Sequence, residues 1–202
     1  MRYLPRDGAV EREALAKSMM RRLWRDGVCV GLLLLLPLLL FAPVSLGGRT
    51  LLPVDVLYLF EPYREMAARA GVGSVHNGLV ADLILENYVW KQFLVDALES
   101  RTLPLWNPYL FSGQPFLANG QHSALYPLTW LFLVVPIARA FGLFTVLQLG
   151  LTAVWMYVYG RVLRIGRVGA LVGGIVFGLS GFMTISVVHP MIIAGASWLP
   201  LL

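Results

Sequence analysis

Long stretches without formal charge divide this chain into segments that a bilayer could hold. The first runs from Gly27 to Gly48, between Asp26 and Arg49. Its length matches the roughly 20 apolar residues that cross a bilayer as a helix. Prolines inside the run remove backbone donors, so we expect them to bend or shorten the helix. Further apolar runs follow, and residues 27–48 are therefore predicted to be a retained first span and not a cleaved leader.

Two more apolar windows lie in the second half of the chain, at residues 141–163 and 168–188. Each is long enough to cross the membrane, and the second is rich in glycine, which lets helices pack closely. Residues 125–138 are apolar over too short a length to cross, so they are predicted to form an interfacial or re-entrant helix. Residues 191–202 have the composition of the start of a further membrane helix, which suggests the N-terminal part of a larger protein.

The distribution of basic residues predicts the orientation. Residues 1–26 carry seven basic and four acidic side chains, and three arginines follow the second span, whereas residues 49–101 carry five basic and seven acidic side chains. Positive charge favours the cytoplasmic side. Residues 1–26 are therefore predicted to be a cytoplasmic basic segment, and residues 49–124 an extracytoplasmic loop. Within the first segment, residues 10–24 fit either a short amphipathic helix on the inner surface or a solvated charged tail.

Composition narrows the class of protein. The chain is 58% hydrophobic and 13% charged, with a mean hydropathy of +0.72, far from the values of a soluble domain. Its high isoelectric point comes from a shortage of acids and not from a basic stripe, which argues against a nucleic-acid partner. A single cysteine, Cys29, excludes an internal disulfide. We predict an all-α polytopic membrane protein with three transmembrane helices, the start of a fourth, a large helical first outer loop, and the lipid bilayer as partner.

The predicted outer loop contains the candidate chemistry. It is far longer than a connection between helices requires. Helices are expected over residues 54–68, with an interruption at Pro62, and from Asp82 to Ser100. Asp55 follows the first span closely, and Asp82 opens the loop helix. A carboxylate at the membrane boundary suits a general base acting on a hydroxyl acceptor when the sugar donor is lipid-linked. Asp82 could instead cap its helix, and Asp55 could be a solvated loop acid.

Other candidates are less distinctive. His189, at the outer end of the third span, could bind a phosphate or sugar hydroxyl, or could end the helix together with Pro190. Arg64, Lys91 and Arg139 are possible counter-ions for a donor phosphate, although no spacing distinguishes them. Histidine, cysteine and acidic residues do not occur at zinc-ligand spacing, so no metal site is predicted, and a need for a divalent metal stays open.

The run LPLWNPYLFSGQPFLANGQHSALYPL, Leu103 to Leu128, closely resembles the signature of the YfhO-like family of bacterial polytopic membrane proteins. The neighbouring features are also similar: a Leu-Leu-Pro-x-Asp element that ends at Asp55, an asparagine ahead of Asp82, an arginine-rich turn after the second span, and His189. The residues of the signature block are Leu103, Pro104, Leu105, Trp106, Asn107, Pro108, Tyr109, Gly113, Pro115, Ala118, Asn119, Gln121, Tyr126 and Pro127.

This family resembles the GT-C glycosyltransferases, multispan enzymes that take sugars from polyprenyl-phosphate donors and carry an acidic catalytic residue in the first outer loop. The resemblance implies a GT-C-like fold in the bacterial cytoplasmic membrane and a catalytic carboxylate at Asp55 or Asp82. We therefore expect Asp55 and Asp82 to line one outer cleft that is roofed by the segment from Trp106 to Gln121. The acceptor is then a cell-envelope polymer, a lipid or a protein. The substrate-binding candidates are Glu86, Trp106, Asn107, Tyr109, Asn119, Gln121 and His189.

Two departures from the family pattern stand on the loop helix, where Glu86 replaces glutamine and Val89 replaces proline. Because Glu86 lies one turn after Asp82, the two acids are expected to raise one another's pKa. Alternative functions are a non-enzymatic transporter or flippase for lipid-linked sugars, and a catalytically inactive scaffold. A transporter is expected to place polar groups at the membrane midplane between broken helices, and the predicted spans carry few.

Overall fold

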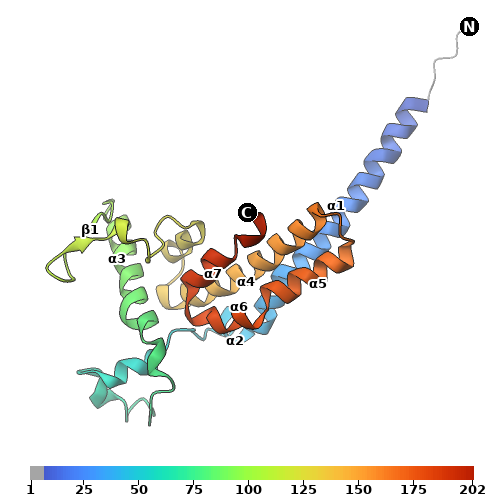
Figure 1. Cartoon of the computed structure of the whole chain (residues 1–202). Helices are drawn as coiled ribbons and strands as arrows, with labels where there is room; N and C mark the ends of the chain where they lie inside the picture. The colour runs from blue at the N-terminus through green and yellow to red at the C-terminus, as the bar shows by residue number, and fades with distance from the viewer. Residues whose placement is uncertain (1–6) are drawn as a thin grey trace, which may run out of the picture.

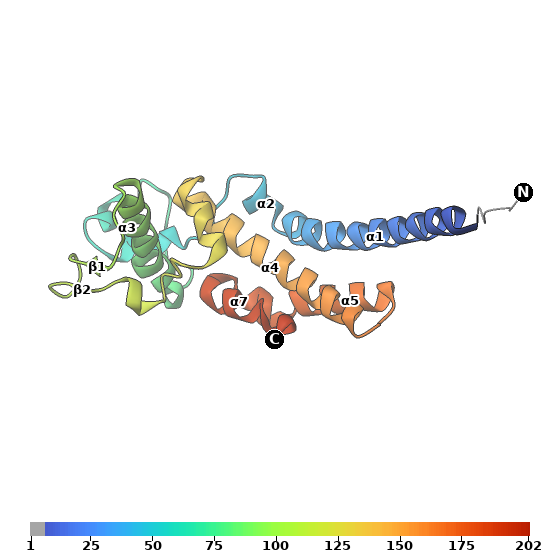
Figure 2. The same ribbon diagram turned by 90° about the horizontal axis from the view of Figure 1, so that it is seen from above.

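The computed structural model describes residues 7–202, so the first six residues of the predicted segment 1–26 lie outside the description. The described chain is mostly helical, and three of its helical stretches are long and apolar enough to cross a membrane: Arg12–Leu40, Ile137–Val162 and Arg167–Val188. This agrees with the predicted all-α membrane protein. Figures 1 and 2 show an elongated molecule, with the loop elements at one end of the helices and the start of α1 at the other.

The first span belongs to a single 34-residue helix, α1 (Asp7–Leu40), which is about 51 Å long at about 1.5 Å per residue. Residues 10–24 are helical, so the alternative of a solvated charged tail is wrong, and the helix continues into the span without a break. That this segment lies on the inner membrane surface stays a prediction. The helix contains Pro37 and ends at Leu40. A short helix, α2 (Ala42–Ser45), follows with a proline in its first turn, and the Ser45 hydroxyl donates to the Leu38 carbonyl at 2.7 Å.

Close backbone contact joins the next two helices, α4 (Ile137–Val162) and α5 (Arg167–Gly178). A Cβ atom added at Gly178 would lie 2.6 Å from the Cβ of Ala153, and one at Gly174 would lie 2.7 Å from the Ala153 carbonyl oxygen. Leu33 of α1 is buried against the same cluster. Small residues thus let the three helices approach closely, as expected for packing in lipid, where van der Waals contact drives helix association.

Asp26 fastens one end of this bundle. Its carboxylate oxygen Oδ1 accepts a hydrogen bond from the Tyr157 hydroxyl at 2.6 Å and from Nε of Arg167 at 2.9 Å, and Nε of Arg161 lies 3.3 Å away. These side chains come from α1, α4 and the start of α5. The basic N-terminal half of α1 and the arginine-rich turn therefore lie at the same end of the molecule. The contacts of Asp26 that join them were not predicted from the sequence.

The segment predicted as the third span is broken. Helix α5 ends at Gly178, and α6 (Gly181–Ile185) begins after Ser180, whose hydroxyl accepts the Met183 backbone N–H at 3.4 Å. A 3-10 turn follows at Ser186–Val188, and α7 (Pro190–Ala196) then runs beside α4 (Figure 2). A last 3-10 turn covers Leu199–Leu201.

The loop between α2 and α4 folds as short turns around one long helix. The 3-10 turns Val54–Leu59 and Tyr63–Met66 match the expected interrupted helix, while the helix expected from Asp82 is divided into a π-helical turn and α3. The segment predicted as an interfacial helix is a 3-10 turn followed by the start of α4. The remaining bounds are Gly78–Val80 (3-10), Leu83–Asn87 (π), α3 Tyr88–Glu99, β1 Trp106–Asn107, β2 Gln114–Pro115, Leu117–Asn119 (3-10) and Pro127–Leu133 (3-10).

An aromatic and aliphatic cluster attaches this loop to the bundle. Val56 from the first 3-10 turn and Leu83 from the π-helical turn pack with Phe132 and with Phe141 and Phe144 of α4, and all five are almost fully buried. Burial of side chains of this size contributes roughly 1.5–3 kcal/mol each. The loop is thus held against the end of α4, next to the chain segment that leaves the third span.

Candidate functional site

Two of the predicted site residues, Asp82 and His189, line the same small cleft, although they lie far apart in the sequence. One wall comes from the start of the loop helix and the other from the segment that joins the third span to α7. The cleft has a volume of about 100 Å³ and is lined by Val80, Asp82, Leu83, Asn87, Val188, His189, Pro190, Met191 and Ile192. The structure therefore joins the loop between α2 and α4 to the third apolar stretch at a position that carries a carboxylate and an imidazole.

The local conformation leaves the Asp82 side chain free of a capping role. Asp82 has helical backbone angles and makes no side-chain capping hydrogen bond, so the prediction that it caps the loop helix is wrong. A capping bond is made earlier, where Oδ1 of Asn77 accepts the Leu79 backbone N–H at 3.0 Å. The exposed Asp82 carboxylate can therefore accept a proton or a hydrogen bond from a ligand in the cleft.

Asn87 is a cleft residue that the sequence did not single out. Its amide nitrogen donates to the Asp82 carbonyl at 3.1 Å, while its oxygen Oδ1 is buried and has no hydrogen-bond partner among the described residues. Buried polar atoms are nearly always paired, so this oxygen is a candidate acceptor for a ligand hydroxyl. The π-helical turn Leu83–Asn87 sets this position, and such turns occur frequently at functional sites.

Asp55 does not line this cleft. Its Oδ2 accepts the backbone N–H of His76 at 2.8 Å and lies 3.4 Å from Nδ1 of the same residue. The hydrogen bond from the His76 backbone is the main cause that lowers the pKa of the Asp55 carboxyl. Its neighbour Val56 packs near Leu83, so the two acid-bearing segments adjoin. The expected shared cleft of the two carboxylates is not formed: Asp55 instead ties two parts of the loop together.

The Trp-Asn-Pro-Tyr block forms a two-stranded hairpin in which Trp106 pairs with Pro115. Asn107 is buried, and its Oδ1 accepts the Tyr109 backbone N–H at 2.9 Å, which fixes the turn. The Trp106 ring covers Gly113, where an added Cβ would lie 2.5 Å from Nε1 and the backbone has φ +105°. The signature residues thus build a specific turn, and Asn107 is engaged within it.

This hairpin borders a second groove and does not roof the Asp82 cleft. The groove has a volume of about 340 Å³ and runs beside α3, where Phe93 and Asp96 face Trp106 and Tyr109 across it. Asp96 also accepts a hydrogen bond from Gln92 at 2.8 Å. Glu86, Asn119, Gln121 and Arg139 are exposed and line neither space. Arg64 is also exposed, and it donates to the Leu59 carbonyl at 2.7 Å.

Lys91 is buried in the loop and is not a counter-ion for a ligand. Its Nζ donates to the His122 carbonyl at 2.5 Å and to Oγ1 of Thr129 at 3.2 Å, and it lies 4.9 Å from the ring centre of Phe132. Burial lowers the pKa of Lys91 to about 7. The prediction that Lys91 binds a donor phosphate is therefore wrong: this side chain links α3 to the segment before α4.

His122 was not among the predicted site residues, and its backbone carbonyl accepts a hydrogen bond from Lys91. Its ring stacks on Phe116 at 3.9 Å between centroids. Nδ1 accepts the Ala124 backbone N–H at 3.0 Å, and Nε2 lies 2.6 Å from the Phe116 carbonyl oxygen. This pattern fits a neutral imidazole with its proton on Nε2, and burial lowers the pKa of His122. Both ring nitrogens are occupied, so His122 organises the loop.

The buried lysine predicts a pH-dependent stability. Between about pH 7 and pH 10.5 the unfolded chain keeps the Lys91 proton, whereas the folded protein has released it. The free energy of unfolding should therefore rise with pH in this window, by up to about 1.4 kcal/mol per pH unit. The contribution is constant below the window. Thermal unfolding of the wild-type protein and of Lys91→Met between pH 6 and pH 10 tests this, and an equal slope in both proteins would contradict it.

Comparison with known proteins finds no matching family model, no matching curated protein and no matching solved structure. The resemblance to the YfhO-like family therefore stays a prediction from the Leu103–Leu128 signature and the features around it. Within residues 7–202, no group of three or more histidine, cysteine or acidic side chains is placed to hold a metal ion. The cleft of Asp82, Asn87 and His189 brings together groups that can take up a proton and form hydrogen bonds with a ligand.

Proposed function

We propose that this protein is a membrane glycosyltransferase that uses a polyprenyl-phosphate sugar as donor, with its reacting centre at the cleft of Asp82 and His189. The observation that carries the proposal is the convergence in one cleft of three groups: a carboxylate that makes no capping hydrogen bond, an imidazole, and an amide oxygen that has no hydrogen-bond partner within residues 7–202. The cleft lies where the loop meets the end of a membrane span. A lipid-linked donor keeps its phosphate at this level, so a reacting group must lie here as well.

Each cleft residue has a role in the proposed reaction. The acceptor hydroxyl oxygen forms a bond to the anomeric carbon, the bond from that carbon to the donor phosphate oxygen breaks, and polyprenyl phosphate leaves with the electron pair. Asp82 takes the hydroxyl proton as general base. His189 binds a sugar or phosphate oxygen, and Oδ1 of Asn87 accepts a hydrogen bond from a sugar hydroxyl. A volume of about 100 Å³ is below the roughly 300–1,000 Å³ of complete ligand sites, so the cleft holds the reacting groups only.

We also propose the family of the protein and its location in the cell. The signature around Trp106 supports membership of the YfhO-like, GT-C-type enzymes of the bacterial cytoplasmic membrane. The excess of basic residues at the end that holds Asp26 and Arg167 supports a cytoplasmic N-terminus and an extracytoplasmic loop. The acceptor is then a cell-envelope polymer, a lipid or a protein outside the membrane.

A transporter or flippase for lipid-linked sugars is the second candidate, and two features of the spans favour it. The third span is broken between Gly178 and Gly181, and discontinuous helices form the binding sites of many transporters. Gln148 of α4 is fully buried, and neither atom of its amide has a hydrogen-bond partner among the described residues. Buried polar groups in a membrane bundle are often functional.

The fate of the donor separates these functions. We would incorporate the protein into vesicles with polyprenyl phosphate that carries a radiolabelled hexose, and would add an extract of cell-envelope acceptors outside. The transferase proposal predicts that label moves covalently to the acceptor fraction and that free polyprenyl phosphate appears in equal amount. Donor that only changes leaflet would identify a transporter, and donor that does neither would leave a scaffold; both results would overturn the proposal.

A further inference from the structure

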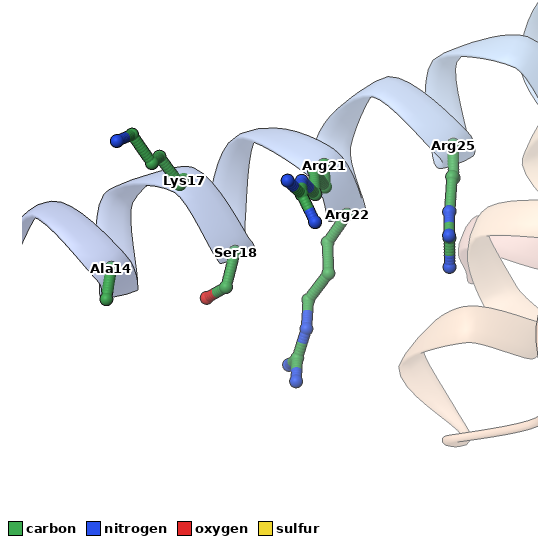
Figure 3. A pocket seen from close by; sticks show the side chains of 6 residues that line it. All are labelled: Ala14, Lys17, Ser18, Arg21, Arg22 and Arg25. Carbon is green, nitrogen blue, oxygen red and sulfur yellow. The ribbon is translucent and has the colours of Figure 1, made fainter.

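The N-terminal half of α1 has two chemically different faces. At about 3.6 residues per turn, its large apolar side chains lie on one half of the helix circumference and four basic side chains on the other. Arg12 and Glu13, at the start of the stretch, fall on the apolar half. Figure 3 shows Lys17, Arg21, Arg22 and Arg25 projecting from this stretch of the ribbon together with Ala14 and Ser18. The apolar side chains are Leu15, Met19, Met20, Leu23 and Trp24.

The apolar face is uncovered in the structure. Leu15 is 70% exposed and Trp24 is 74% exposed, and Figure 1 shows this part of α1 extending beyond the other helices. The only ion pair along the stretch among the described side chains joins Lys17 to Glu13 at 2.6 Å, and both partners are about two-thirds exposed. A row of large apolar side chains in water is unfavourable and marks an interaction surface.

We propose that residues 12–25 lie along the bilayer surface and bind anionic phospholipid headgroups. The helix continues directly into the first membrane span, and Asp26 is fixed to Tyr157 and Arg167 at the end of the bundle, so the bilayer surface is within reach. That surface offers acyl chains to the apolar face and phosphates to the basic face. Amphipathic basic helices bind in this way.

Gly27 is the point at which the helix can change direction. It lies between the amphipathic stretch and the charge-free span, and a Cβ added there would meet nothing within 4 Å, so no other helix packs against this position. The hydrogen bond from Arg167 to the Arg22 carbonyl, at 3.4 Å, is the contact that such a bend would have to break or carry along. Glycine lowers the helix propensity at this position, and kinks in long helices often occur at such residues. A bend at Gly27 turns the apolar face of residues 12–25 towards the acyl chains while the Asp26 contacts stay in place.

The experiment uses the whole chain with Cys29→Ala and a spin label at Met19→Cys on the apolar face or at Ser18→Cys on the basic face. The protein is placed in nanodiscs of phosphatidylcholine alone or of phosphatidylcholine with phosphatidylglycerol. We expect phosphatidylglycerol to raise oxygen accessibility and lower nickel-chelate accessibility at position 19, while position 18 stays accessible to the chelate. Each basic side chain should change the docking equilibrium by about 5-fold.

Two charge variants serve as a matched pair. Arg21→Gln, Arg22→Gln and Arg25→Gln together should lower the docking equilibrium by about 100-fold. Removing the same charge from exposed loop positions, with Arg49→Gln, Arg69→Gln and Arg101→Gln, should leave it unchanged. A label at position 19 that is equally accessible to the chelate in both bilayers would overturn the proposal. A label shielded from both reagents in both bilayers would do so too, because it would show a protein partner on this face.

Discussion

Asp82→Asn should lower sugar transfer by about 100- to 10,000-fold, the range expected for the loss of a general base. The substitution keeps the shape of the side chain but removes its ability to take a proton from the acceptor hydroxyl. Because Asp82 makes no capping hydrogen bond, the loop helix and the amount of folded protein should be unaffected. Initial rates of label transfer in vesicles, normalised to the folded protein recovered after gel filtration, provide the measurement.

Glu86→Gln is the matched control for this experiment. Glu86 lies one turn further along the same helix and is exposed, but it does not line the cleft. Its replacement removes the same charge from the same helix, so a general electrostatic effect would lower transfer in both variants. The proposal requires a loss confined to Asp82→Asn; normal transfer by that variant would remove Asp82 from the reaction.

Gly178→Ala should destabilise the bundle even though alanine favours helix formation. The new methyl group would lie 2.6 Å from the Cβ of Ala153 and 3.0 Å from its Cα and nitrogen, so α5 must move away from α4. Overpacking of this kind costs about 1–3 kcal/mol, more than the roughly 0.5–1 kcal/mol that alanine gains over glycine in a helix. Thermal unfolding in detergent should show a lower midpoint than in the wild-type protein.

Gly173 provides the comparison on the same helix. A methyl group there would meet only the end of the flexible Met156 side chain, at 4.0 Å. Gly173→Ala should therefore leave the unfolding midpoint unchanged or raise it slightly. Equal midpoints for the two alanine variants would show that α4 and α5 are not in close contact in the membrane.

The charge-free windows along the chain were enough to predict the membrane class and the three long apolar helical stretches. A window without charge long enough to cross a bilayer has few other stable structures. The same reasoning could not show that α1 continues to Asp7, because amphipathic and charged residues are compatible with both a continuous and an interrupted helix. Nor could it show the break near Ser180, since glycine and serine occur in unbroken membrane helices as well.

The candidate site could be predicted only in part. Asp82 was identified from its place at the start of the predicted loop helix, and His189 from its place at the outer end of the predicted third span. Their common cleft depends on how the loop packs on α4, which local patterns do not determine. The position of the Asn87 side chain depends on a π-helical turn, and no residue pattern predicts such a turn. Lys91 was predicted as a possible counter-ion for a donor phosphate, and no local pattern shows that it is buried. Its acceptors, the His122 carbonyl and Thr129, lie more than thirty residues away in the sequence.

The most direct test of the account is a cross-link across the cleft from outside the cell. With Cys29→Ala, the variant Asp82→Cys, His189→Cys would be treated in intact cells with a short, membrane-impermeant bifunctional thiol reagent. We expect an intramolecular cross-link that needs both cysteines and forms without permeabilisation. A cross-link that forms only in opened cells would place the cleft inside. Two cysteines that react singly but never join would show that the loop and the third span do not meet.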